Sequence, residues 1–156
     1  MSKIRYLVEA AIIAAMYAVL TIFIPGGSGQ IQVRVSEALT VLAFFTPAAV
    51  PGLFVGCFVA NYVIGVGIYD LIFGSLATLL AAYLTSKMPV KYLAPLPPVI
   101  INAVVVAFIW KLMGNLPILV TMGFVALGEV IACYGLGYLL ILFLEKHGSK
   151  LFRREN

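Results

Sequence analysis

The sequence predicts an all-α membrane protein, a compact bundle of six transmembrane helices that forms a single domain over residues 1–156. Hydrophobic residues make up 63% of the chain and charged residues only 10%. Apolar runs of helix length recur throughout, as expected of segments that cross a hydrocarbon core about 30 Å thick. A soluble domain of this length would need far more polar surface. The composition therefore leaves no room for a separate soluble catalytic domain.

The expected helices cover residues 4–24, 36–47, 50–65, 69–86, 96–113 and 117–145, with an outer loop over 25–35. The second and third could also form one long kinked helix, because Pro47 and Pro51 can either bend a helix or separate two. With six helices, eight of the ten basic residues and both termini lie on the cytoplasmic side, and only Arg34 and Lys111 lie outside. Five helices would invert this distribution, so the positive-inside rule favours six.

The second expected helix is short for a membrane crossing. Ser36 to Thr46 spans about 16 Å at 1.5 Å per residue. This helix must therefore either extend beyond these residues or stop short inside a bundle that lines a cavity. The first helix is long by comparison, and although Lys3 and Arg5 precede it, no convincing cleavage site follows. We therefore expect a retained membrane span rather than a signal peptide.

Small residues predict where the helices pack closely, because lipid provides no hydrophobic drive for helix association. The third expected helix has them at a spacing of four, at Ala48, Gly52, Gly56 and Ala60. The first helix has two adjacent alanine rows, and internal packing needs only one of them. The second row suggests a face that meets another membrane protein. The rows are Ala10, Ala14 and Ala18, and Ala11 and Ala15.

Three acids are expected in the outer half of the bundle, where each ionisable group costs about 2.5–3.5 kcal/mol to insert. Glu37 and Asp70 can also be explained by helix starts, with Ser36 as the cap of the second helix. Glu129 lies about 18 Å beyond Pro117 along its helix, too deep for a capping role. We expect no lysine or arginine at that depth, so the partner of Glu129 is expected to be a ligand donor.

The three acids together indicate a cavity that favours a positively charged ligand with N–H donors, since a carboxylate accepts two parallel hydrogen bonds. Asn61, Asn102, Tyr69 and Trp110 are further candidates for this site. Asn102 can equally form a hydrogen bond between helices, and the two aromatic residues can equally belong to an interfacial belt. The glycine-rich loop 25–35 is a candidate lid. Glu9 is expected to pair with Arg5 and to have no substrate role.

An enzyme is not expected. The only histidine, His147, lies in the expected cytoplasmic tail, and Cys57 and Cys133 both lie in apolar helices without a basic neighbour. The cysteines are therefore expected to form neither a disulfide nor a metal site. No phosphate-binding glycine–lysine loop is present, so the chain is expected to need no cofactor of its own. The basic residues form no patch for nucleic acid.

Five strings resemble one membrane protein family, the substrate-binding (S) components of energy-coupling factor (ECF) transporters of the QueT type. They are QVRVSEALTVL (32–42), FTPAAVPGLFVGC (45–57), DLIFGSLATLLAA (70–82), LAPLPPVIINA (93–103) and VALGE (125–129). The resemblance implies six helices in a bacterial plasma membrane and high-affinity binding of a queuosine precursor, 7-aminomethyl-7-deazaguanine or a close relative. It also implies docking onto a coupling subunit driven by two ATPase subunits, through Ala10, Ala11, Ala14, Ala15 and Ala18.

These observations lead to a hypothesis for binding. The guanine-like edge of the ligand pairs with Glu129, and its aminomethyl cation is met by Glu37 or Asp70. One alternative is a stand-alone secondary carrier for a small cationic vitamin-like or nucleobase-like solute, for which internal repeats would be typical; the sequence shows none.

Overall fold

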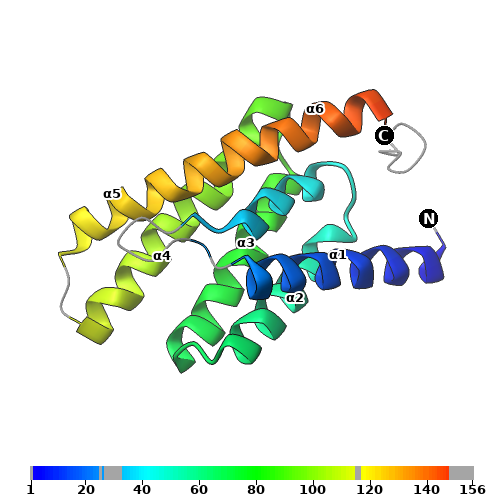
Figure 1. The fold of residues 1–156 in the computed structure, drawn as a ribbon. Coiled ribbons are helices and arrows are strands. Elements are labelled where there is room, and N and C mark those ends of the chain that lie inside the picture. Colours follow the sequence, from blue (N-terminus) through cyan, green and yellow to red (C-terminus); the bar gives the residue numbers. More distant parts are fainter. Residues whose placement is uncertain (1, 25, 27–32, 115–116, 148–156) are drawn as a thin grey trace.

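The computed structural model describes residues 2–24, 26, 33–114 and 117–147, and every regular element in these ranges is helical (Figure 1). The all-α prediction is therefore confirmed for this part of the chain. The elements are α1 (Lys3–Phe23), η1 (Val35–Phe44), α2 (Ala49–Ile64), η2 (Asp70–Gly74) leading into α3 (Ser75–Ser86), a turn η3 (Lys91–Leu93), α4 (Leu96–Gly114), and α5 (Ile118–Glu129) continuing through η4 (Val130–Gly137) into α6 (Tyr138–His147).

Three helical stretches are long and apolar enough to cross a membrane: Lys3–Phe23, Lys91–Gly114 and Ile118–His147. Three further apolar helices are shorter, at Val35–Phe44, Ala49–Ile64 and Asp70–Ser86. The described ends of α1 and α6 lie at the same end of the molecule (Figure 1), as an even number of crossings requires. Six complete crossings with cytoplasmic termini stay a prediction from charge and hydropathy.

The short second helix, η1, is enclosed by the bundle. Its residues from Ser36 to Ala43 are all buried, and it contacts α1, α3, η4 and α6. It is a 3₁₀-helix, whose rise of about 2 Å per residue makes ten residues roughly 20 Å long. This helix therefore stays short, with bounds of Val35–Phe44, and is packed among its neighbours.

Glycines let α1 and α2 approach to backbone contact. A Cβ atom on Gly52 would lie 2.6 Å from the carbonyl oxygen of Ala10, and one on Gly56 would lie 2.7 Å from that of Ala14. The close packing that the small residues of α2 predicted is therefore confirmed. One alanine row of α1 is used for it, with Ala18 buried, whereas Ala11 and Ala15 in the other row are exposed.

The expected ion pair at the start of α1 is confirmed. Arg5 Nε lies 2.9 Å from Glu9 Oε1 near the start of α1, as the i,i+4 spacing predicted. Cys57 and Cys133 are both buried and free. Beneath the inner face of α1, Ile13 and Tyr17 pack with Leu39 and Leu53 into the largest apolar core. This core supports one side of the polar site described next.

Candidate functional site

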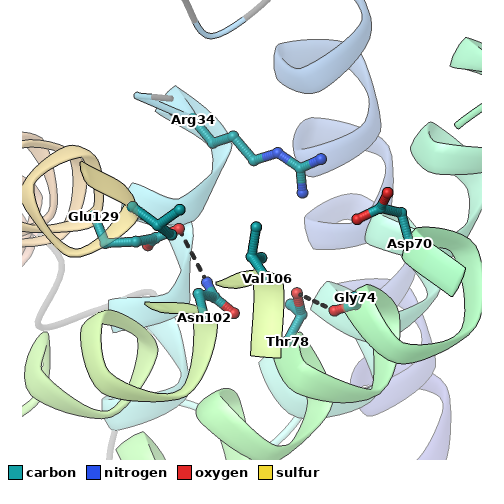
Figure 2. A pocket seen from close by; sticks show the side chains of 8 residues that line it. Arg34, Asp70, Gly74, Thr78, Asn102, Val106 and Glu129 are labelled. Atoms are coloured by element: carbon teal, nitrogen blue, oxygen red, sulfur yellow. Dashed lines mark hydrogen bonds between the residues drawn. The ribbon is translucent and has the colours of Figure 1, made fainter. Parts of the chain in front are cut away.

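A polar pocket opens between η1, α3, α4 and α5 (Figure 2). Its lining residues come in rows at a spacing of four, which places each row on one face of its helix. Arg34, which immediately precedes η1, completes the wall. The rows are Asp70, Gly74 and Thr78 on η2 and α3, Asn102 and Val106 on α4, and Val125 and Glu129 on α5.

Glu129 is 4% exposed and has partners within the chain. Its Oε1 accepts a hydrogen bond of 3.1 Å from Nδ2 of Asn102, and its Oε2 accepts one of 3.5 Å from Sγ of Cys133. Asn102 thus serves both as a bridge between helices and as part of the pocket wall. The expectation that Glu129 depends on a ligand donor for a partner is wrong, because Asn102 on α4 and Cys133, one turn further along the helix of Glu129, supply two polar groups.

The place of Arg34 in a loop suggested a position on the outer surface, but the structure shows otherwise. Its guanidinium extends into the pocket between Glu129 and Asp70 (Figure 2). It is close enough to interact electrostatically with Glu37, Glu129 and Asp70. The prediction that no basic residue reaches the depth of Glu129 is therefore wrong, since a long arginine stem can carry its charge inward toward acids.

Glu37 lies behind the pocket wall rather than on it. It is 1% exposed, and its Oε1 accepts a hydrogen bond from the hydroxyl of Tyr17 on α1. Its backbone carbonyl oxygen lies 3.6 Å from Sγ of Cys133, the thiol that also contacts Glu129. Among the described residues Oε2 of Glu37 has no hydrogen-bond partner. Glu37 and Glu129 are therefore neighbours joined through Cys133.

The prediction that Ser36 caps this helix is wrong, although Glu37 lies in its first turn, as the explanation from the helix dipole expected. The residue before η1 is Arg34, and no side chain caps this helix. The hydroxyl oxygen of Ser36 instead accepts a hydrogen bond of 2.7 Å from Thr21 on α1. Two buried polar residues of η1 thus bond to α1.

Asp70 is the first residue of η2 and lies in its first turn, and the residue before it, Tyr69, makes no side-chain capping hydrogen bond. The carboxylate of Asp70 points toward the pocket (Figure 2). Its backbone carbonyl oxygen accepts a hydrogen bond of 3.3 Å from Nδ2 of Asn61. Asn61 is buried and lies outside the pocket lining. Its role in the structure is therefore to fix the start of η2 through this hydrogen bond.

Tyr69 and Trp110 are not part of the pocket lining. Tyr69 is 46% exposed, and its ring stacks on that of Phe73 with centroids 6.4 Å apart. Trp110 is partly buried. The interfacial explanation fits both positions better than a ligand contact does.

Both pocket acids stand beside π-helical segments. Asp70 begins η2, and Glu129 directly precedes η4. Single π-helical turns within α-helices are frequent at functional sites, because the wider turn changes the direction of the side chains around it. Hydropathy does not reveal such segments, but the four-residue spacing of Asp70, Gly74 and Thr78 could have indicated this face of the pocket.

The hollow itself is small, about 20 Å³, which holds about one water molecule. A two-ring ligand therefore needs the wall to move. The expected lid, 25–35, lies mostly outside the described residues. Within the described residues no three histidine, cysteine, aspartate or glutamate side chains are grouped so that they could hold a metal ion.

Comparison with known proteins agrees with these features. The profile of the QueT transporter family matches residues 7–146. A protein of Lactococcus lactis subsp. cremoris (strain MG1363), named queuosine precursor transporter QueT, is 40% identical over 82 residues. This alignment covers 50% of the chain and 47% of the relative, so the chain matches about half of the relative's length. No solved structure matches the chain.

Proposed function

The chain belongs to the QueT transporter family, a family of transporters rather than enzymes, and we propose that it captures a queuosine precursor at the outer face of a bacterial plasma membrane. The ligand is 7-aminomethyl-7-deazaguanine or a close relative. The observation that carries this proposal is the pocket that brings Asp70, Asn102 and Glu129 together. The binding site is formed from α3, α4 and α5 beside the buried helix η1.

The chemistry of the pocket suits such a ligand. A guanine-like edge carries two parallel N–H donors, which one carboxylate can accept together. Glu129 takes this edge, and Asn102, which already bonds to Glu129, holds the carboxylate in place. The primary ammonium of the ligand is met by Asp70, because this carboxylate lies on the wall while Glu37 lies behind it.

The chain acts as a high-affinity S component of an ECF importer. It contains no nucleotide-binding loop, so ATP is hydrolysed by two partner ATPase subunits, and a coupling subunit links them to this chain. The exposed row of Ala11 and Ala15 supports docking at the outer face of α1, since small residues allow close helix contact in lipid. The other alanine row packs α1 onto its neighbours and so fixes the orientation of this exposed face. Its residues are Ala10, Ala14 and Ala18.

Calorimetry with purified protein tests capture directly. The wild-type chain is expected to bind 7-aminomethyl-7-deazaguanine, and Glu129→Gln to bind it at least about tenfold more weakly because a charge-assisted bond is lost. Glu9→Gln is the matched control, since Glu9 pairs with Arg5 away from the pocket. Unchanged affinity in Glu129→Gln would remove this residue from the site.

A stand-alone carrier is the competing function for the same pocket. Proteoliposomes that contain only this chain would then accumulate the ligand. For an S component, uptake is expected only when the coupling subunit and both ATPase subunits are present with ATP. Equal uptake in both preparations would contradict the ECF assignment while leaving the binding site intact.

A further inference from the structure

The guanidinium of Arg34 forms part of the lining of the acid-rich pocket. Figure 2 shows it between the carboxylates of Glu129 and Asp70, and it interacts electrostatically with both and with Glu37. Among the described residues it has no ion pair within 4.0 Å with any of these acids. Arg34 therefore balances the charge of the pocket without being locked to one partner.

The size of the pocket shows why this position matters. With Arg34 in place the remaining space is about 20 Å³, roughly that of one water molecule. Of the lining residues, Arg34 has the longest and most flexible side chain and precedes its helix, whereas the others project from helices packed together. A ligand that reaches both Glu129 and Asp70 must take the space that the guanidinium fills.

We propose that Arg34 is the internal counter-ion of the ligand-free pocket, that the positive charge of an incoming ligand replaces it, and that Arg34 thereby competes with the ligand for the pocket acids. This inference rests on the proposed function for the identity of the ligand. A cationic ligand restores the charge balance that is lost when the guanidinium leaves. A neutral ligand of the same shape leaves the acids unbalanced, which is unfavourable in a low-dielectric interior.

Ligand affinity is the first test. Affinities for 7-aminomethyl-7-deazaguanine and its neutral 7-cyano analogue are measured by calorimetry for wild type, Arg34→Gln and Arg34→Lys, with Lys111→Gln as the control at the exposed end of α4. In Arg34→Gln both affinities are expected to rise about tenfold, because the ligand no longer has to displace a charge that the acids hold. The ratio of the two affinities is expected to stay that of wild type, because the guanidinium is displaced in both complexes. Arg34→Lys and Lys111→Gln are expected to keep the wild-type affinities.

Two results would overturn the inference. An equal loss of affinity for both ligands in Arg34→Gln would mean that Arg34 is a ligand contact that stays in place. Unchanged affinities for both ligands would mean that the guanidinium does not compete with the ligand for the acids. Either outcome leaves the binding function itself standing.

Stability of the ligand-free protein is a second test that needs no ligand. Arg34→Gln is expected to lower the Tm in detergent, and to lower it by less than half as much when Glu129 is already Gln, because the counter-ion then has less charge to balance. The same loss in both backgrounds would contradict a counter-ion role. If wild type bound neither deazaguanine, the proposed ligand would fail, and this cycle would still decide whether Arg34 balances the pocket.

Discussion

The hydroxyl of Tyr17 on α1 donates a hydrogen bond to the carboxylate of Glu37 on η1, and both side chains are almost completely buried. Glu37 in turn contacts Cys133, which contacts Glu129 in the pocket wall. The helix with the exposed alanine row is thus connected to the candidate binding site through three polar contacts. These contacts explain why Glu37 is buried beside the pocket although it does not line it.

Removing that hydroxyl is expected to destabilise the protein. Tyr17→Phe keeps the ring but leaves both carboxylate oxygens of Glu37 without a hydrogen bond among the described residues, at a cost of about 1–3 kcal/mol. Thermal unfolding in detergent measures this loss. Tyr62→Phe is the control, because Tyr62 is 72% exposed. Equal Tm values for the two variants would show that the buried contact contributes nothing.

Close packing of α1 on α2 makes a second prediction. A methyl group on Gly56 would meet the backbone of Ala14, which cannot retreat as a side chain can, so Gly56→Ala is expected to cost about 1–3 kcal/mol. Gly123→Ala on α5 meets no atom within 4 Å and is expected to be neutral or slightly stabilising. A stable Gly56→Ala variant, measured by the same unfolding assay, would contradict the contact.

The exposed alanine row predicts a loss of transport without a loss of binding. Ala11→Leu combined with Ala15→Leu roughens the outer face of α1 and is expected to reduce ATP-driven uptake in proteoliposomes with the complete ECF complex at least about fivefold, because small residues permit the close approach. Calorimetric affinity for the ligand is expected to stay unchanged. Val59→Leu, an exposed apolar site on α2, serves as control. Wild-type uptake in the double variant would rule out docking through this row.

Most of the helical fold could be predicted from the sequence, because each helix is an apolar run ended by proline, glycine or charge. Gly65 shows this well: it ends α2 with a φ of 76°, a left-handed conformation that glycine adopts without strain. The 3₁₀ form of η1 and the π-helical turns beside Asp70 and Glu129 could not be predicted. They depend on how neighbouring helices satisfy the backbone, which hydropathy does not record.

The site was predicted in part for a related reason. Glu129, Asp70 and Asn102 could be found because a polar group at membrane depth is costly and so stands out. Arg34 was missed because charge counting treats a basic residue in a loop as part of the surface. Tyr17 and Cys133 were missed because both fit an apolar helix, and only their distances to Glu37 reveal a polar contact.

The central claim is that Glu129 binds the guanine-like edge of the ligand and Asp70 binds its ammonium. Comparing variants of these two acids tests it most directly. Affinities of wild type, Asp70→Asn and Glu129→Gln are measured for 7-aminomethyl-7-deazaguanine and for the neutral 7-cyano analogue. Glu129→Gln is expected to weaken both at least about tenfold, because both share the guanine-like edge, whereas Asp70→Asn weakens only the aminomethyl ligand by a similar factor. Wild-type affinity for both ligands in both variants would contradict the assignment of this pocket as the capture site.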